Sequence, residues 1–434
     1  MKKRLLSKSK YMNGLQCPKY LWLIFNDPTK IAEPDASTQY IFDEGHRLGD
    51  LAKKLFPNGI DIPTGDFLGN LNQTRKLLKE NRPLFEPAFY VNNVYSRLDI
   101  LNPAGDGVWD IYEVKGSTAF KDEHIHDVSF QRYCCQKAGL EIRKCFLVHI
   151  NNQYVKFGDI EPAKLFTTEE ITEKVQAIAG NVEDTANDMF ETIASSRCPD
   201  IGIGPHCNEP YPCPVGECWD SLPENNIFEL HRGGKKCFDL LNQGILHISE
   251  IPPEVKLSAV QRIQQACEIS GNHHLDETAI RDFLGSLLYP MYYLDFETFN
   301  PMIPIYDGTR PYQKIPFQFS LHVVEKEGTF PFQYSFLADG NTDPRHGLLK
   351  ELKSALGERG SIVVYNQTFE KGVLAELGES FQEYRTWVKQ IHDRIPIFMS
   401  HSGISVITIL YRKAARPLRT CFPRLRGRAI PVYL

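Results

Sequence analysis

Three residues of the N-terminal half, Asp99, Glu113 and Lys115, have the types and spacing to bind a metal ion and activate water. Asp99 lies near the end of one apolar-alternating run, and Glu113 and Lys115 end the next run, 108–115. The Pro- and Gly-containing segment 102–107 between the runs predicts a β-hairpin. Residues two positions apart on a strand project from the same face, so Glu113 and Lys115 are expected to lie together.

The chemistry available to such a group is phosphodiester hydrolysis. Paired carboxylates bind hard cations such as Mg²⁺ or Mn²⁺. The ion acidifies a water molecule and neutralises phosphate charge, while a lysine orients the water. The alternative interpretation is an exposed strand whose acid and lysine are merely solvated, which is a common arrangement.

Clustered cysteines indicate a second centre. Cys207, Cys213 and Cys218 follow one another with Pro and Gly between them, and Cys17 is the best candidate for a fourth thiolate. Zn²⁺ and a [4Fe–4S] cluster both accept four thiolates, and the spacing does not choose between them. We expect five further cysteines to be buried free thiols: Cys134, Cys135, Cys145, Cys237 and Cys267.

The combination resembles the RecB-like iron–sulfur nucleases, a branch of the PD-(D/E)XK nucleases that includes AddB-type recombination and CRISPR-adaptation nucleases. The resemblance covers about residues 5–220 and implies a [4Fe–4S] cluster that joins the two ends of the domain. It also implies that His46, expected on an amphipathic helix, is a further ligand of the catalytic metal. Gln131, on the helix after the Glu113 strand, would orient the site.

Two positions depart from the pattern of these nucleases. The family usually has a tyrosine four residues after the glutamine, where this chain has Cys135 with Tyr133 nearby. Cys198 is an additional cysteine that could replace one of the expected cluster ligands.

A second acidic set lies in the C-terminal half. Asp295 and Glu297 alternate on the strand 291–299, and Asn366 and Glu370 lie where a later strand runs into a helix. Such carboxylates suit two divalent ions that clamp a phosphodiester. The alternative is an edge strand with solvated acids, but we expect the flanking apolar positions to be buried on both faces.

This region resembles the DnaQ-like, RNase H-like exonucleases. Asp295 and Glu297 match the acids of the first motif, and Glu370 occupies a position where aspartate is more usual. The third motif is missing. Residues 396–434 instead contain no Asp or Glu, and we interpret them as an out-of-frame, prematurely ended segment; the alternative is an appended nucleic-acid-binding arm. Its basic residues are Arg412, Lys413, Arg416, Arg419, Arg424, Arg426 and Arg428.

Composition is that of a large globular protein. The chain has 434 residues, 24% of them charged, a net charge of −5 and eleven cysteines. No segment approaches the length of a membrane span, and without a signal peptide the cysteines favour a reducing cytoplasm. We expect an α/β protein with four parts: 1–220, a PD-(D/E)XK restriction-endonuclease-like domain; 221–288, a helical connector; 289–395, an incomplete RNase H-like domain; and 396–434, the basic tail.

The function expected from these features is that of a metal-dependent deoxyribonuclease. We expect its partner to be nucleic acid, with DNA preferred, and we expect no membrane association. The sequence does not indicate protein partners. The N-terminal site should be active and the C-terminal site impaired. The alternatives are a nucleic-acid-binding protein without turnover and a zinc-structured interaction scaffold. The arrangement of domains resembles a bacterial two-nuclease family of unknown function.

Overall fold

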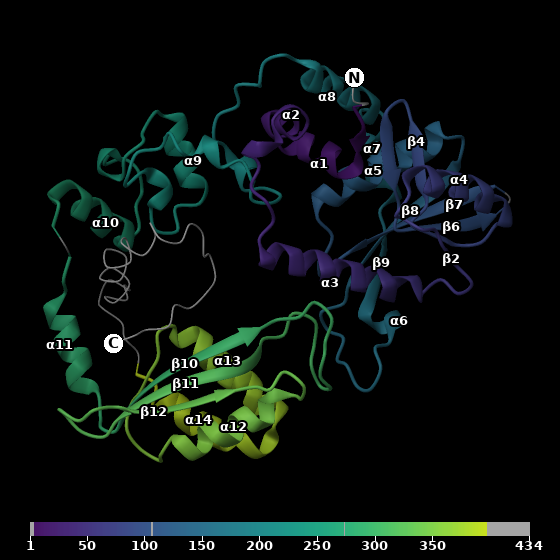
Figure 1. Ribbon diagram of the computed structural model, residues 1–434. Helices are drawn as coiled ribbons and strands as arrows, with labels where there is room; N and C mark the ends of the chain where they lie inside the picture. Colours follow the sequence, from purple (N-terminus) through teal and green to yellow (C-terminus); the bar gives the residue numbers. More distant parts are fainter. Residues whose placement is uncertain (1–3, 106, 273, 397–434) are drawn as a thin grey trace. The chain divides into compact units, whose positions relative to one another are not determined.

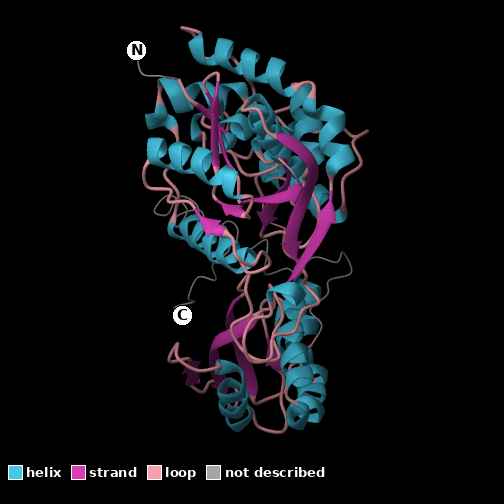
Figure 2. Ribbon diagram, turned by 90° about the vertical axis from the view of Figure 1, so that its right-hand side faces the viewer, coloured by secondary structure: helices cyan, strands magenta, loops and turns pink. Residues whose placement is uncertain are grey.

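The computed structural model describes residues 4–105, 107–272 and 274–396, in which helices and strands are mixed (Figures 1 and 2). The chain divides into two compact units, each with its own core. Unit 1 comprises Met1–Leu222 and Met302–Tyr312, and unit 2 comprises Pro223–Pro301 and Gln313–Leu434. The division lies close to the boundary expected after residue 220. The expected connector falls within unit 2, and so does the expected third region apart from Met302–Tyr312.

A six-stranded sheet organises the described part of unit 1, in the order β2-β3-β6-β7-β8-β9. β6 and β7 are antiparallel, β8 runs parallel to β7, and β9 is antiparallel to β8. A smaller sheet has the order β1-β5-β4. The strands of this unit are β1 Leu6–Ser7, β2 Ile60–Asp61, β3 Leu84–Phe85, β4 Ala88–Val91, β5 Val94–Arg97, β6 Ile100–Gly105, β7 Val108–Lys115, β8 Glu141–Ile150 and β9 Phe166–Glu170.

Two helices cover the opposite faces of strand β7. Trp109 and Ile111 belong to a core that includes residues of α5, while Tyr112 and Val114 pack in a core that includes residues of α3. Because strand side chains alternate between faces, Glu113 and Lys115 lie on the α5 face. The helices of this unit are α1 Lys8–Gln16, α2 Pro18–Asn26, α3 Ala36–Lys53, α4 Phe67–Leu77, α5 Asp122–Lys137, α6 Pro162–Leu165, α7 Thr172–Ala179 and α8 Val182–Ala194.

The hairpin around Asp99 differs from the expected one in two ways. The first run does not form one strand, because Asn92 and Asn93, with φ of 48° and 63°, make a tight turn between β4 and β5. Asparagine tolerates this left-handed conformation well. Asp99 therefore lies at a bend just before β6. Pro103 stays inside β6 at a register shift, so the turn is shorter than 102–107.

The segment Met302–Tyr312 packs with unit 1 although the chain around it belongs to unit 2. Its backbone bonds to Lys156, whose N–H donates to Thr309 O at 3.0 Å. The Lys156 ammonium also lies 2.6 Å from an oxygen of Asp307. The Tyr312 hydroxyl donates to the carbonyl of Gly116, the residue that follows Lys115.

The described part of unit 2 contains a four-stranded sheet in the order β12-β11-β10-β13. β10, β11 and β12 are antiparallel neighbours, and β13 runs parallel to β10. The strands are β10 Met291–Phe299, β11 Ile315–Val324, β12 Phe332–Leu337 and β13 Ile362–Val363. The helices are α9 Lys235–Asn242, α10 Ala259–Ser270, α11 Glu277–Ser286, α12 Pro344–Ala355, α13 Gln367–Ser380 and α14 Arg385–Asp393.

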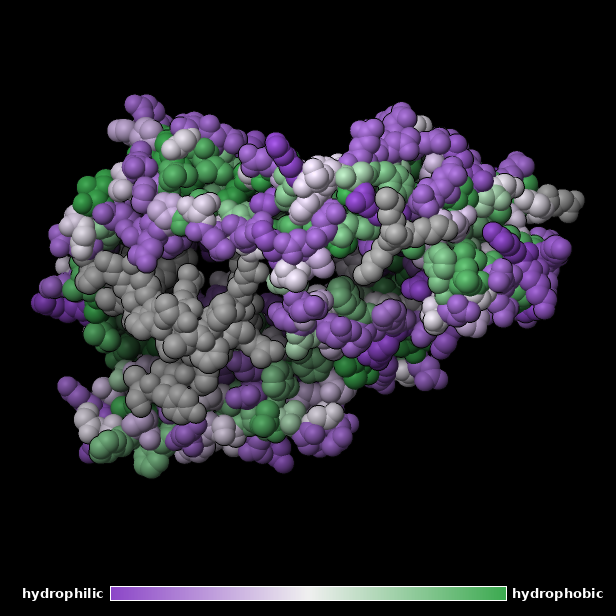
Figure 3. All heavy atoms as spheres, turned by 45° about the horizontal axis from the view of Figure 1, so that its top comes forward, coloured by the Kyte–Doolittle hydropathy of each residue, from purple (hydrophilic) through white to green (hydrophobic). Residues whose placement is uncertain are grey.

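Hydrophilic side chains cover much of the face in Figure 3, with apolar groups between them. In the described part of the chain, no helix is both long enough and apolar enough to cross a bilayer.

Candidate functional site

A buried group of charged side chains joins strand β7 to helix α5. Glu113 and Gln131 are 1% and 0% exposed. The Lys115 ammonium lies 2.7 Å from Glu113 Oε1 and 2.5 Å from Asp127 Oδ2. Gln131 Nε2 donates to Glu113 Oε2 at 2.6 Å and to Asp127 Oδ1 at 2.9 Å. The structure thus brings Glu113 and Lys115 together, as their spacing predicted, places Gln131 beside them, and adds Asp127.

Lys8, at the start of α1, reaches the same carboxylates from the N-terminus. Its ammonium lies 2.8 Å from Glu113 Oε1 and 3.4 Å from Asp127 Oδ1. Its side chain is 24% exposed, almost the same as that of Lys115. We call Lys8, Asp99, Glu113, Lys115, Asp127 and Gln131 the carboxylate–lysine cluster.

Asp99 lies against the strand that carries Glu113. Its Oδ2 accepts a hydrogen bond of 2.7 Å from the backbone N–H of Val114. Its negative charge also acts on Glu113, Lys115 and Lys8. The bend before β6 therefore brings the two predicted acids near each other, although Asp99 is not on a strand.

The surroundings shift the pKa values of Glu113 and Asp127 in opposite directions. Burial, together with the nearby charges of Asp127 and Asp99, raises the pKa of Glu113 to about 7. Burial alone would raise the pKa of Asp127 too, but the ammonium groups of Lys115 and Lys8 outweigh it and hold that pKa below its usual range. A cation binds the ionised carboxylate, so at Glu113 it would compete with a proton.

His46 is not placed with these acids. It is exposed, and the buried residues of its helix are Glu44, Leu48 and Ala52. Leu48 and Ala52 pack with Tyr112 and Val114, which are side chains of the sheet face opposite Glu113. Among the described residues, no group of three His, Cys, Asp or Glu side chains is arranged as the ligands of one ion.

For the nuclease expected from the sequence, replacing Gln131 with alanine should slow metal-dependent cleavage by about 10–100-fold, the usual cost of losing a residue that orients a metal ligand. Its amide holds Glu113 and Asp127 in place through two hydrogen bonds. Steady-state cleavage of labelled DNA measures the effect, with Gln136→Ala, near the end of the same helix, as the matched control. Equal rates for both variants would refute a role for Gln131.

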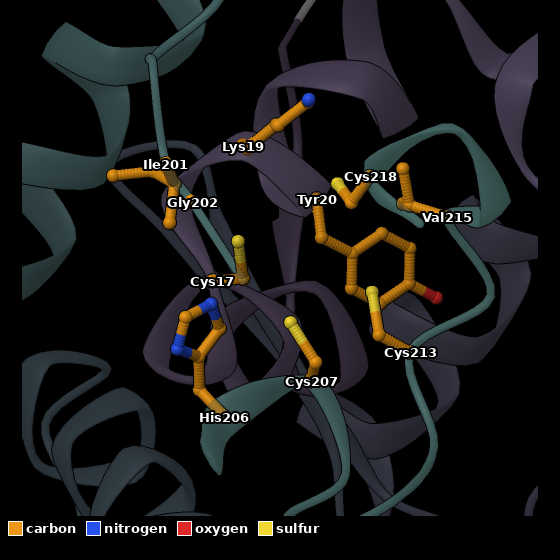
Figure 4. Close-up of a pocket in the computed structure, with 10 residues that line it drawn as sticks. All are labelled: Cys17, Lys19, Tyr20, Ile201, Gly202, His206, Cys207, Cys213, Val215 and Cys218. Carbon is orange, nitrogen blue, oxygen red and sulfur yellow. The ribbon is translucent and has the colours of Figure 1, made fainter. Parts of the chain in front are cut away.

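The four predicted cluster cysteines line one pocket, although they come from opposite ends of the first 220 residues. Figure 4 shows the sulfur atoms of these residues around the side chain of Tyr20. Cys17 lies between α1 and α2, and Cys207 and Cys218 lie in short 3-10 turns. We call the following residues the cysteine pocket: Cys17, Lys19, Tyr20, Ile201, Gly202, His206, Cys207, Cys213, Val215 and Cys218.

Backbone contacts hold the loop of the cysteine pocket against the N-terminal segment. The N–H of Cys213 donates to Cys207 O at 2.8 Å, and that of Ala32 donates to Pro214 O at 3.2 Å. Gln16 Nε2 donates to the carbonyls of His206 and Tyr211 at 2.8 and 2.7 Å. The loop is thereby fixed to the end of α1, one residue before Cys17.

The donor set of the pocket suits a thiophilic metal centre. Four sulfur side chains share one pocket with Lys19, and the hydrogen bond of that lysine with Glu217, with a smaller contribution from Cys218, raises its pKa despite burial. Burial raises the pKa of the Cys207 and Cys213 thiols, so a metal would displace their protons on binding. Their residue types suit four-thiolate ligation of Zn²⁺ or of a [4Fe–4S] cluster, although the side chains are not arranged around a single ion in this structure.

The remaining cysteines of the described residues lie outside this pocket. Cys134, Cys135, Cys145 and Cys237 are buried, as expected, and Cys267 is half-buried. Burial raises the pKa of Cys134 and of Cys145, which keeps both thiols protonated. Cys198 is half-buried and does not line the pocket. Burial raises the pKa of its thiol, and the nearby charge of Lys19 partly offsets this effect.

In unit 2, the two acids of β10 lie on one face of the sheet. Buried residues on this strand are Tyr292, Leu294 and Phe296, whereas Asp295 is exposed and Glu297 is half-buried. The expectation that the strand is buried on both faces was therefore wrong. One face packs on the core, and the acids project from the other, more open face.

Glu370 lies near Asp295 at the start of α13. Asn366 caps this helix, its side chain accepting from the N–H of Phe369 at 3.4 Å. Glu370 is 2% exposed, and its Oε2 has no hydrogen-bond partner. Burial, with a contribution from the charge of Asp295, raises the pKa of Glu370 to about 7. An unpartnered carboxylate oxygen beside a second acid is suited to a cation.

Of the tail 396–434, all but Pro396 lies outside the described residues.

Neutralising Glu370 should remove a pH dependence from the stability of unit 2. The pKa of Glu370 in the folded state is raised above the unfolded value near 4.5, because burial favours the protonated acid. Protonated Glu370 therefore contributes its full stability below pH 4.5, and this contribution is lost as pH rises through about 7. In metal-free buffer, Glu370→Gln should match the wild type at pH 5 and exceed it at pH 8 by on the order of 2 kcal/mol.

Denaturant unfolding at both pH values measures this difference in the free energy of unfolding. Glu379→Gln, at an exposed position of the same helix, is the matched control and should be neutral throughout. A Glu370→Gln variant less stable than the wild type at pH 8 would contradict the expected effect.

Residues 292–402 match the model of a domain of unknown function, DUF2779. No curated protein matches this chain. The matched segment includes Asp295, Glu297 and Glu370, so the second acidic group lies within a recognised domain whose activity has not been assigned. The carboxylate–lysine cluster and the cysteine pocket lie outside it.

Proposed function

We propose that this protein is a metal-dependent deoxyribonuclease whose active site is the carboxylate–lysine cluster of unit 1. The observation that carries the proposal is the contact of Glu113 and Lys115 with each other and with Gln131 and Asp127 on α5. A solvated acid–lysine pair would not explain why Glu113 is 1% exposed and held by three side chains.

The topology of unit 1 supports the same assignment. An antiparallel hairpin, β6–β7, is followed by α5 and by β8 parallel to β7, which places the acids of the hairpin beside the helix that carries Gln131. This arrangement is the one expected of a PD-(D/E)XK restriction-endonuclease-like domain. The cysteine pocket supports the RecB-like branch, with a [4Fe–4S] cluster as the preferred occupant and Zn²⁺ as the alternative.

Asp99 and Glu113 would hold Mg²⁺ or Mn²⁺, which when bound acidifies water and neutralises phosphate charge. Lys115 orients the attacking water and stabilises negative charge that develops on the phosphate. Asp127 keeps Lys115 charged, because their ion pair raises the pKa of the ammonium group. Gln131 fixes the direction of the Glu113 carboxylate. His46 is exposed on α3, and the family resemblance alone supports it as a further ligand.

In unit 2 we propose an RNase H-like exonuclease domain with Asp295, Glu297 and Glu370 as its metal ligands. Three antiparallel strands followed by a helix and a parallel strand beside the first, in the order β12-β11-β10-β13, support this proposal. Thiolate ligation requires a reducing compartment, so we propose the cytoplasm as the location.

The test is direct. Anaerobically purified full-length protein is given end-labelled single- and double-stranded DNA with Mg²⁺, with Mn²⁺ and with EDTA. We expect cleavage with either metal and none with EDTA. DNA binding without cleavage across these metals would refute the nuclease proposal and favour a binding protein without turnover. In such a protein, the ion pairs of Lys8 and Lys115 with Glu113 would keep metal ions from that carboxylate.

A further inference from the structure

Lys8 supplies a second ammonium group to the carboxylate–lysine cluster, from a helix that carries none of the predicted catalytic residues. It contacts Glu113 Oε1 at 2.8 Å and Asp127 Oδ1 at 3.4 Å. Lys115 already pairs with both carboxylates. The two lysines share Oε1 of Glu113 and contact different oxygens of Asp127, so the geometry of these acids depends on α1 as well as on β7.

The other end of α1 is attached to the cysteine pocket. The helix has nine residues, from Lys8 to Gln16, and Cys17 is its C-terminal cap. At 1.5 Å per residue it spans about 13 Å. Gln16 donates to the carbonyls of His206 and Tyr211 on the loop of the pocket. One short helix therefore joins the charged cluster to the sulfur atoms.

Close packing makes α1 suitable for transmitting a displacement. The ring of Tyr11 stacks on Phe130, with centroids 4.5 Å apart, directly before Gln131. At Gly14, an added Cβ would come within 2.8 Å of the Met189 side chain. Side chains packed this tightly pass a shift of the helix onward instead of absorbing it.

We propose that Lys8 is a positioning residue for Glu113 and Asp127, and that a metal-loaded cysteine pocket keeps it in place through helix α1. The catalytic part of this inference rests on the proposed nuclease function. Loss of the metal centre frees the loop that Gln16 holds, and the start of α1 then withdraws from Glu113. The sulfur centre thereby controls a site that its own atoms do not touch.

The structural test measures the chemical reactivity of Lys8. Reductive dimethylation, followed by mass spectrometry, compares labelling of Lys8 and Lys144 in anaerobic wild type and in Cys213→Ser. Removing the ion pairs with Glu113 and Asp127 should raise Lys8 labelling by about threefold or more. Lys144, a surface residue of β8 paired with Glu170, should be labelled equally in both proteins.

A second variant separates the linkage from general unfolding. Gln16→Met leaves all the thiols in place and removes only the two hydrogen bonds to the loop. It should retain its iron or zinc and still show increased labelling of Lys8. Unchanged Lys8 labelling in Gln16→Met, or in a folded Cys213→Ser protein that has lost its metal, would overturn the proposal.

Activity provides the second readout. Lys8→Met should lower kcat for DNA cleavage by about 10-fold or more, with KM little changed and the metal content of the cysteine pocket intact. Lys8→Arg should recover part of the rate. Lys10→Met is the control, since Lys10 lies on the same helix but packs over the ring of Phe25. A Lys8→Met enzyme with wild-type kcat would overturn the positioning role.

The two readouts keep this inference distinct from the nuclease proposal. If the wild type cleaves no DNA, the proposed function fails, and the labelling of Lys8 still decides whether α1 links the two centres. If the wild type cleaves DNA and Lys8→Met does so equally well, only the inference about Lys8 fails.

Discussion

Replacing Lys115 with methionine should slow Mg²⁺-dependent cleavage of DNA by about 10²–10⁴-fold, the range of a positioned proton-transfer group. Lys115 ends β7 with its ammonium within hydrogen-bonding distance of both Glu113 and Asp127. Methionine keeps the apolar stem but cannot orient water or stabilise an anion. Because Asp99 and Glu113 remain, the variant should still bind Mn²⁺.

Lys144→Met is the matched control for this substitution. Lys144 lies on β8 of the same sheet, and its ion pair with Glu170 is exposed, so its loss should cost little. Thermal unfolding of both variants shows whether unit 1 remains folded. Cleavage by Lys115→Met within twofold of the wild-type rate would remove Lys115 from the mechanism.

Replacing Cys213 with serine should empty the cysteine pocket of its metal and destabilise unit 1. Structural thiolate sites contribute directly to folding free energy, and here the pocket joins Cys17 to a loop about 190 residues later. We expect loss of bound iron and sulfide, or of zinc, and a fall in Tm on the order of 10 °C. Elemental analysis and calorimetry of anaerobic samples measure both.

Cys267→Ser is the control, since Cys267 is half-buried on α10 of unit 2. It should keep the full metal content and the wild-type Tm. Iron in excess of zinc in the wild type would identify a cluster as the main occupant. Full metal retention by Cys213→Ser would show that this cysteine is not a ligand.

Local spacing predicted the part of the candidate site that lies within one strand. Glu113 and Lys115 share a face because they are two residues apart, and the structure places both beside Asp127. Asp127 itself was missed, although it lies one helical turn before Gln131, where i,i+4 side chains meet. An isolated acid on a helix resembles a solvated residue until its partners are known.

Contacts between distant segments could not be read from spacing. Lys8 meets Glu113 across 105 residues of chain, and nothing in its own sequence neighbourhood distinguishes it from the other lysines of the N-terminus. Cys207, Cys213 and Cys218 stood out as a local cluster, whereas Cys17, about 190 residues earlier, was only the best candidate for a fourth thiolate. Hydrogen bonds from Gln16 then bring that cysteine to the loop.

The spacing of residues along α3 could have predicted that His46 is exposed. Glu44, Leu48 and Ala52 recur every four residues and are the buried residues of α3. His46 lies two residues from Glu44 and Leu48, about 200° around the helix, and is exposed. A similar lesson comes from β10, where aromatic residues suggested burial on both faces but Tyr293 is exposed.

The most direct test of the account is whether Glu113 helps to hold a divalent cation. Mn²⁺ binding is measured by electron paramagnetic resonance in a Glu370→Gln background, which removes one of the three proposed ligands of unit 2. The account predicts that this protein binds one Mn²⁺ in unit 1 and that the added Glu113→Gln substitution abolishes binding and cleavage together. Unchanged Mn²⁺ binding after Glu113→Gln, in a folded protein, would contradict it.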